Sequence, residues 1–308
     1  MMSRETILKC LGELPPKVGL NAKIVDSADR GTHTLQLVAY TVEEGERVNA
    51  WLLIPKKPGG KYPAIIALHQ HNGEYFLGKS EPAGLSKNPM YHYGLELCLR
   101  GYAVLCPDHL GFEDRRPPEY IRMGNPHLDG GSYEGYLFTK YCLMGRTLQG
   151  KYVSDLSRAV DLLESLEYVD AGRIGAIGHS LGGQEALWLT WFDPRIRAGV
   201  SSCGFSQLHS IVRDGINHNL AMYTPGFLKE GDIADLVCGI APRPFMFTNG
   251  TADGIFPLDG VREIAEAAQK AYAAAGAADT VKSVLFEGAH SFPEEIRQSA
   301  YEWLDRHL

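Results

Sequence analysis

The residue pattern that most strongly suggests chemistry is Gly178-His179-Ser180-Leu181-Gly182, a G-x-S-x-G sequence. It directly follows an apolar run at 174–177, and a helical stretch begins immediately after it. A strand–turn–helix of this kind lifts a serine hydroxyl above a sheet on a strained turn, and only glycine fits where the turn meets its neighbours. The helix would begin beside Ser180, where the backbone N–H of Leu181 could stabilise an oxyanion. The pattern predicts a nucleophilic serine; the alternative is a glycine-rich turn without chemistry.

A nucleophilic serine needs an imidazole to accept its proton and a carboxylate to orient that imidazole. In the fold class that carries a G-x-S-x-G turn above a parallel sheet, these partners follow later strands, in the order Ser, acid, His. Asp253 lies on a loop after the apolar run 245–248, whereas Asp259 is expected to be a plain first-turn carboxylate of the next helix. After Asp253 the only histidines are His290 and His307, and the penultimate His307 is expected to face solvent. Asp253 and His290 are therefore the predicted acid and base; a hydrogen-bonded loop histidine is the alternative for His290.

The segment His69-Gln70-His71-Asn72-Gly73, which also follows an apolar run, is a candidate for the second oxyanion donor. We assign this donor to the backbone N–H of His71, with that of Gln70 as the alternative. The imidazoles of His69 and His71 could instead bind a metal, because H-x-H places both on one face of a strand. The sequence offers no accompanying carboxylate cluster, third nearby histidine or HExxH, so we expect no metal and no cofactor. His69 is expected to pack beneath the loop.

Short apolar runs, each followed by a polar loop and a longer helical stretch, must position these residues. The runs are 64–68, 103–106, 174–177, 199–202, 245–248 and 283–286. Runs that are apolar on both faces are typical of parallel strands covered by helices on both sides. Two extended stretches, 34–42 and 48–54, precede them with a turn between and predict an antiparallel hairpin. The fold class is therefore α/β, with a mostly parallel eight-stranded sheet.

The alternation of strands and helices predicts a single domain over residues 1–308, with an N-terminal helical extension at 1–30. Two stretches, 111–150 and 205–239, are longer than plain crossovers. Loops this long inside a compact domain usually cover or line a functional site, so we interpret them as insertions that form the substrate pocket or a cap. Ordered surface excursions are the alternative. The candidate pocket walls are Tyr133, Tyr136, Phe138 and Tyr223.

Composition excludes several classes of protein. The 308 residues include 30 Lys and Arg against 37 Asp and Glu, a net charge of −7, which disfavours a nucleic-acid partner. No apolar run approaches the roughly 20 residues of a membrane span, and the first residues lack a secretory apolar region. The six cysteines lack paired C-x-x-C spacing and are expected to be buried or free thiols. We expect a cytoplasmic monomer or small homo-oligomer acting on a small molecule.

With these residues placed, the chain resembles the α/β-hydrolases over about residues 30–308. It is most similar to the dienelactone hydrolase-like and acetyl-xylan-esterase-like branch, which is related to prolyl oligopeptidase catalytic domains. The matching segments are 68–73, 107–112, 178–183, 250–253 and 288–290. Two positions depart from the pattern. His69-Gln70 stands where the family usually has His-Gly, and Ser180 stands where dienelactone hydrolases proper carry Cys, which argues against their substrate.

The residues and the resemblance together predict an enzyme that cleaves carboxylic esters through an acyl-enzyme on Ser180, with Asp253 and His290. An aminopeptidase or acyl-peptide-type amidase could use the same three residues, although the chain carries no propeller-like repeats. A non-catalytic ligand-binding protein of the same fold is a further alternative. A serine nucleophile excludes dehalogenase and epoxide-hydrolase chemistry, which needs a carboxylate at that position.

Overall fold

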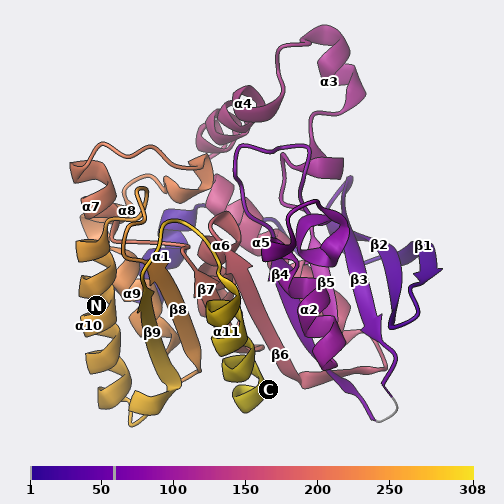
Figure 1. Cartoon of the computed structure of the whole chain (residues 1–308). Helices are drawn as coiled ribbons and strands as arrows, with labels where there is room; N and C mark the ends of the chain where they lie inside the picture. The colour runs from indigo at the N-terminus through magenta and orange to yellow at the C-terminus, as the bar shows by residue number, and fades with distance from the viewer. Residues whose placement is uncertain (1, 58–59) are drawn as a thin grey trace.

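The six short apolar runs are all strands of one sheet in the computed structural model, which describes residues 2–57 and 60–308. The predicted domain bounds of 1–308 also contain residues 1, 58 and 59, which lie outside the described residues. The order across the sheet is β1-β2-β3-β5-β4-β6-β7-β8-β9 (Figure 1). The strands are β1 (Lys23–Asp29), β2 (His33–Glu43), β3 (Glu46–Pro55), β4 (Tyr62–Leu68), β5 (Ala103–Pro107), β6 (Val169–His179), β7 (Ile196–Ser202), β8 (Phe245–Gly250) and β9 (Val281–Phe286).

The sheet is mixed, with a parallel part and an antiparallel part. Strands β4 to β9 pair in parallel, and the predicted hairpin is β2 and β3, which joins them through an antiparallel pairing of β3 with β5. The prediction of eight strands was wrong, because β1 pairs antiparallel with β2 and makes nine among the described residues. Strand β1 lies within the predicted helical extension, whose described part, residues 2–30, is helical only at Arg4–Leu11. Six of its seven residues are exposed at the sheet edge, so its sequence carries no apolar pattern.

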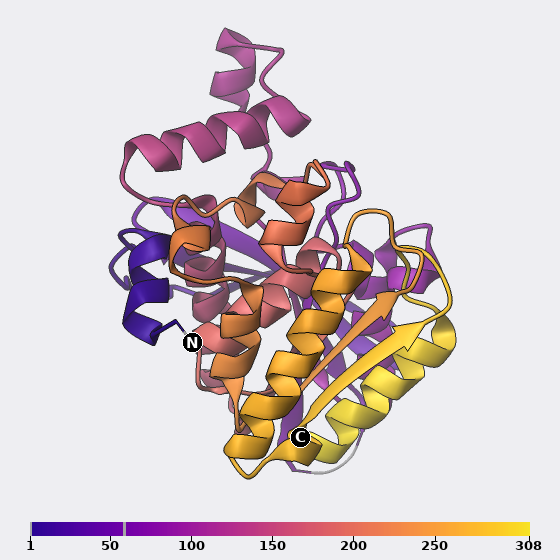
Figure 2. The ribbon, with the colours of Figure 1, turned by 90° about the vertical axis from the view of Figure 1, so that its left-hand side faces the viewer.

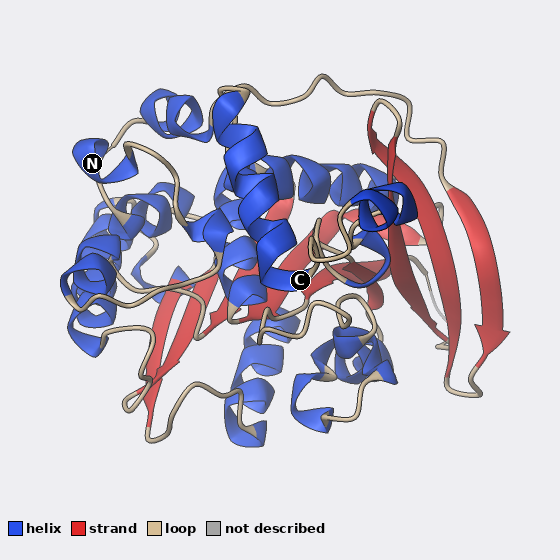
Figure 3. Cartoon of the chain, turned by 90° about the horizontal axis from the view of Figure 1, so that it is seen from above, coloured by secondary structure: helices blue, strands red, loops and turns tan. Residues whose placement is uncertain are grey.

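Helices cover both faces of the parallel strands (Figure 3). They are α1 (Arg4–Leu11), α2 (Tyr93–Arg100), α3 (Glu119–Gly124), α4 (Gly130–Leu143), α5 (Leu148–Glu164), α6 (Leu181–Phe192), α7 (Leu208–Arg213), α8 (Phe227–Glu230), α9 (Ile233–Ile240), α10 (Leu258–Ala274) and α11 (Glu294–His307). Ile65 and Ala67 of β4 pack with α2 and α11, while Ile66 and Leu68 pack with α5 and α6. Successive side chains of this strand thus enter opposite cores, which explains why the run is apolar throughout.

Apart from α9, which packs against α6 and α10, the two long segments fold into helices at the carboxyl ends of the strands (Figure 1). The first contains the short turn η3 (Glu113–Arg115), α3 and α4, and the second contains α7, η4 (Leu220–Met222), α8 and α9. Helices α3 and α4 project from the body as an arm, which Figures 1 and 2 show from two directions. The remaining short turns are η1 (Glu81–Leu85), η2 (Pro89–Tyr91) and η5 (Ala278–Thr280).

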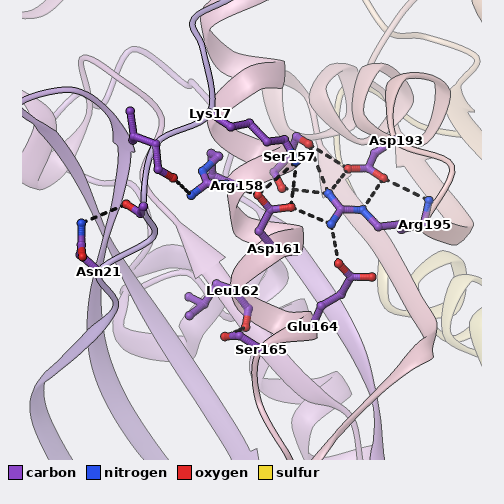
Figure 4. Close-up of polar contacts among 12 residues, drawn as sticks. Lys17, Asn21, Ser157, Arg158, Asp161, Leu162, Glu164, Ser165, Asp193 and Arg195 are labelled. Atoms are coloured by element: carbon purple, nitrogen blue, oxygen red, sulfur yellow. Dashed lines mark hydrogen bonds and ion pairs between the residues drawn. The ribbon is translucent and has the colours of Figure 1, made fainter.

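A cluster of ion pairs fixes α5 at the end of α6 that lies away from Ser180 (Figure 4). The guanidinium of Arg195 donates to Asp161 at 2.7 Å and to Asp193 at 2.6 Å. Arg158 of α5 donates to the carbonyl of Val18 at 2.6 Å and so attaches the N-terminal segment to this helix. These charge-assisted bonds hold α5 and the α6–β7 connection in one arrangement.

Two further expectations concern cysteines and membranes. All six cysteines are free thiols, and four of them are buried: Cys98, Cys106, Cys203 and Cys238. Within residues 2–57 and 60–308, none of the helices combines the length and the apolar character that a membrane span requires.

Candidate active site

Ser180 lies on a sharp turn between β6 and α6, with φ 56° and ψ −120°. A positive φ is strained for a residue with a side chain, and the close packing of neighbouring backbone holds Ser180 in this conformation. A Cβ on Gly182 would lie 1.9 Å from the carbonyl oxygen of Leu68, and one on Gly178 would lie 2.2 Å from the backbone of Gly182. The Ser180 N–H donates to the carbonyl of Ser202 at 2.9 Å. The two glycines therefore permit a close approach that the predicted turn requires.

Asp253 and His290 are joined by a hydrogen bond of 2.8 Å between Oδ2 of the carboxylate and Nδ1 of the ring. They come from the loops after β8 and β9, respectively. The other oxygen of Asp253 accepts the backbone N–H groups of Ile255 and Phe256 at 3.0 and 3.2 Å. Burial alone would raise the pKa of Asp253, but the hydrogen bond and charge of His290, with those two N–H groups, lower it overall. The carboxylate is therefore ionised at neutral pH and orients the imidazole.

Ser180 and His290 line one cavity of about 480 Å³. Its other lining residues are Gln70, His71, Asn72, Tyr75, Gly131, Glu134, Asn217, His218, Asn219, Leu220 and Ile255. The structure thus brings the three predicted side chains to one place, two in the cavity wall and Asp253 behind the ring. Asp259 lies elsewhere, in the first turn of α10, where it pairs with Arg213 as a plain surface carboxylate. His307 does not simply face solvent as expected, because its ring packs against Trp303 at 4.3 Å.

The loop after β4 also lines the cavity, and its two candidate N–H donors differ. The Gln70 N–H donates to the Glu81 carboxylate at 3.2 Å, and the Gln70 side-chain amide donates to the same group at 2.8 Å. Over the described residues, the His71 N–H has no hydrogen-bond acceptor. His69 lies beneath the loop as expected, fully buried, where burial lowers its pKa to about 4. Its Nδ1 donates to the carbonyl of Gln70 at 2.8 Å, so the ring supports the loop as a neutral group.

Both long segments line the cavity, but the four aromatic residues named as walls do not. Tyr133 is buried in a separate core cluster, and Tyr136 is exposed. Phe138 and Tyr223 line a different, apolar groove of about 450 Å³. The prediction was wrong because aromatic character alone does not indicate which side of an irregular segment faces the site. Tyr223 supports two lining residues from behind: its hydroxyl accepts the N–H of His218 at 2.8 Å and donates to Oδ1 of Asn217 at 3.1 Å.

The long segments contribute polar residues to the cavity that no motif in the sequence indicates. Glu134 comes from α4, and Asn217, His218 and Asn219 precede η4. Asn219 donates to the side chain of Gln184 at 3.0 Å, which connects the second segment to the helix that follows Ser180. No local spacing marks these residues, since they reach the cavity only through the packing of segments distant in sequence.

Three carboxylates close enough to share an ion, Asp108, Glu113 and Asp114, surround an amine of the protein. The Nζ of the buried Lys79 lies 2.8 Å from Asp108, 2.6 Å from Glu113 and 2.8 Å from Asp114. The ammonium occupies the position that a cation would take, so this cluster is an ion-pair network that joins the loop after β4 to the segment after β5.

Comparison with known proteins gives a consistent family. The chain matches the acetyl xylan esterase family over residues 8–211 and the prolyl oligopeptidase family over residues 124–308. It is 30% identical over 310 residues to a protein of Bacillus subtilis strain 168 that is named putative hydrolase YtaP. The alignment covers 99% of this chain and 98% of YtaP. Dipeptidyl-peptidase 5 of Porphyromonas gingivalis is 26% identical over 169 residues, 54% of this chain and 20% of that protein.

Solved structures share the fold at low sequence identity. A Bacteroides fragilis protein provisionally assigned to the acetyl xylan esterases has a TM-score of 0.73 at 18% identity, covering 97% of this chain and 80% of its own. The glucuronoyl esterase of Solibacter usitatus has a TM-score of 0.71 at 15% identity, covering 99% and 92%. The family matches and the near full-length relative confirm the resemblance drawn from the motifs. The chain therefore belongs to the acetyl xylan esterase family, carboxylic ester hydrolases of α/β-hydrolase fold that are related to the prolyl oligopeptidases.

Proposed function

We propose that this protein hydrolyses carboxylic esters of small molecules through a covalent acyl-enzyme on Ser180. The observation that carries the proposal is the 2.8 Å bond between His290 and Asp253, on a ring that shares a cavity with Ser180. Because Nδ1 donates to the carboxylate, Nε2 is left as the acceptor that a serine hydroxyl needs. The strained backbone of Ser180 supports the same assignment, since such strain persists where a turn serves a function.

In the proposed reaction, the Oγ of Ser180 bonds to the carbonyl carbon of the ester while its proton passes to Nε2 of His290. The tetrahedral intermediate then breaks its bond to the alcohol oxygen, which takes the proton from His290 and leaves. Water attacks the acyl-enzyme by the same route: its proton passes to His290, the bond to Oγ breaks, and Ser180 regains the proton. Asp253 stabilises the imidazolium in both halves of the reaction.

The oxyanion would be stabilised by the backbone N–H groups of Leu181 and His71. Leu181 is the first residue of α6, so its N–H lies at the positive end of the helix dipole. The N–H of Gln70 already donates to Glu81, whereas that of His71 has no acceptor over the described residues, which favours His71 as the second donor.

The direct test is Ser180→Ala, compared with Ser27→Ala at an exposed position of β1. We expect Ser180→Ala to lower turnover of p-nitrophenyl acetate by about 10³-fold or more and to abolish labelling by a fluorophosphonate, with an unchanged circular dichroism spectrum. Ser27→Ala should behave like the wild type. Undiminished turnover or labelling in Ser180→Ala would refute the mechanism.

Amide hydrolysis by the same residues is the second candidate, and it is favoured by the match to the prolyl oligopeptidase family over residues 124–308. A panel that pairs acetyl and aminoacyl p-nitrophenyl esters with the corresponding p-nitroanilides decides between the two. We expect the ratio of kcat/KM for the ester to that for the anilide to exceed the ratio of their uncatalysed rates. A ratio of kcat/KM below that of the uncatalysed rates would identify an amidase.

We further propose that the protein acts in the cytoplasm, as a monomer or small homo-oligomer. The six free thiols support a reducing compartment.

A further inference from the structure

Glu134 is a nearly buried carboxylate at the cavity wall, and its side chain is 8% exposed. One oxygen, Oε2, accepts from the hydroxyl of Tyr75 at 2.7 Å and from Nε2 of His71 at 3.1 Å. The other, Oε1, accepts the backbone N–H of Leu220 at 2.8 Å. A single side chain of the projecting arm thus connects the loop after β4 to the second long segment.

The ring of His71 is held at both nitrogens. The N–H of Gly73 donates to Nδ1 at 3.0 Å, so Nδ1 accepts and the proton of the neutral ring resides on Nε2, which donates to Glu134. The ring also makes edge contacts with Tyr75 and Phe112, at centroid distances of 4.9 and 5.2 Å. Because hydrogen bonds hold both ring nitrogens and two aromatic rings contact its edges, the main chain of His71 is held relative to α4.

The carboxylate is charged when it makes these contacts. Burial alone would raise the pKa of Glu134, but the hydrogen bonds that the carboxylate accepts from His71, Tyr75 and Leu220 lower it overall. Hydrogen bonds to an ionised acceptor are shorter and stronger than neutral ones, so the three contacts form a firm attachment. No lysine or arginine lies among the residues that line this cavity, so the anion takes its hydrogen bonds from three neutral donors, those of Tyr75, His71 and Leu220.

We propose that Glu134 is a positioning residue for the oxyanion hole: through the imidazole of His71 it holds the backbone N–H of His71 in place to stabilise the negatively charged oxygen of the reacting ester. The proposal rests on the ester hydrolysis proposed above. It assigns the arm a part in the chemistry, in addition to covering the cavity, because a donor stabilises the transition state only if its position is fixed beforehand.

The test is Glu134→Gln, compared with Glu119→Gln on the exposed surface of α3. An amide at position 134 must place its nitrogen either against the donors of His71 and Tyr75 or against the N–H of Leu220. One attachment is therefore lost in either orientation, at almost unchanged volume. Where the oxygen still faces Nε2 of His71, that hydrogen bond weakens, because the acceptor no longer carries a charge. Removing an oxyanion donor lowers kcat by about 10²- to 10³-fold, so displacing one should lower kcat for p-nitrophenyl acetate by about 10- to 100-fold. KM should change less than about threefold, and Glu119→Gln should match the wild type.

A thionoester substrate separates positioning from a general structural role. Its sulfur accepts backbone hydrogen bonds poorly, so a defect confined to the oxyanion hole lowers the rate on the oxygen ester much more than the rate on the matched thionoester. We expect the ester-to-thionoester ratio of kcat/KM to fall about tenfold or more in Glu134→Gln. An equal loss on both substrates, a change in KM alone, or an unchanged kcat would overturn the proposal.

A double-mutant cycle tests whether Glu134 acts through His71. His71→Ala keeps the backbone N–H but removes the ring, so it should reproduce the loss, and adding Glu134→Gln should then lower kcat little further. Independent, multiplicative losses would refute the connection. If Glu134→Gln fails to fold, His71→Ala with the two substrates carries the test alone. Failure of the proposed function itself is distinguishable, since it would appear as activity retained in Ser180→Ala.

Discussion

Replacing Asp253 with Asn tests the assignment of the acid, because it changes one charge while leaving the shape of the site intact. The Oδ1 of the new side chain can still accept the backbone N–H groups of Ile255 and Phe256. Its amide nitrogen must then face Nδ1 of His290, where Oδ2 now accepts at 2.8 Å. Two donors cannot face each other, so the imidazole changes tautomer: Nδ1 becomes the acceptor and Nε2 carries the proton.

With the proton on Nε2, His290 presents a donor to Ser180 and cannot accept the hydroxyl proton. The same tautomeric reversal in a serine protease triad costs about 10⁴-fold in kcat. We therefore expect a loss of about 10³- to 10⁴-fold for Asp253→Asn, equivalent to about 4–5.5 kcal/mol of transition-state stabilisation at about 1.36 kcal/mol per tenfold. Stability should change little, because the side chain remains fully buried and the loop bonds of Oδ1 persist.

The assay is the steady-state rate on p-nitrophenyl acetate near neutral pH, with the thermal midpoint as the control for folding. The matched variant is Asp259→Asn, which removes the charge of the carboxylate six positions along the chain, in the first turn of α10. It should retain wild-type activity. Two results would refute the reasoning: Asp253→Asn retaining a tenth or more of the wild-type rate, or Asp259→Asn losing as much as Asp253→Asn.

Three further predictions concern stability. In Gly182→Ala the new Cβ would lie 1.9 Å from a carbonyl oxygen of β4, so the free energy of unfolding should fall by at least about 3 kcal/mol. Gly135→Ala in α4 has open space around it and should raise the free energy of unfolding by about 0.5–1 kcal/mol; urea unfolding measures both. Lys79→Met, which leaves three carboxylates without their buried ammonium, should cost about 3–5 kcal/mol by the same method, while Lys9→Met in an exposed pair should cost less than about 1 kcal/mol. Burial raises the pKa of Glu185 to about 8, so the folded chain keeps a proton that the unfolded chain releases, and stability is lost as the pH rises from about 4.5 to about 8. Glu185→Gln removes this pH dependence. The difference in thermal midpoint, variant minus wild type, should therefore be larger at about pH 8 than at about pH 5. An equal difference at the two pH values would contradict the raised pKa of Glu185.

The parallel strands were predictable because each is buried on both faces. In β4, all five residues from Ala64 to Leu68 are buried, so the sequence contains a continuous apolar run where other segments contain polar residues. Strand β1 was missed for the complementary reason: its partner β2 supplies backbone hydrogen bonds, and these require no particular side chain. Edge pairing of this kind is determined by the backbone of a neighbour and is not visible in apolar periodicity.

The predicted site residues follow from rules that act over a few residues. Ser180 was identified by glycines two positions away on either side, and Asp253 and His290 by their places in loops after strands. Glu134 could not be identified in this way, because its partners His71 and Leu220 lie 63 and 86 positions away along the chain. Only the packing of the arm over the strand ends brings these groups together.

The loop after β4 carries the proposed oxyanion donor, and carboxylates hold it at three points, one of them, Glu81, within the loop itself. Gln70 donates to Glu81, the ring of His71 donates to Glu134, and Lys79 is surrounded by carboxylates from the segment after β5. Only the Glu134 attachment comes from the arm. Helix α3 of that arm has no buried residues, so the outer part of the arm contributes little to the core. Damage to the α4 contact should therefore reduce catalysis before it reduces stability, because the other two attachments keep the loop folded without fixing the position of His71.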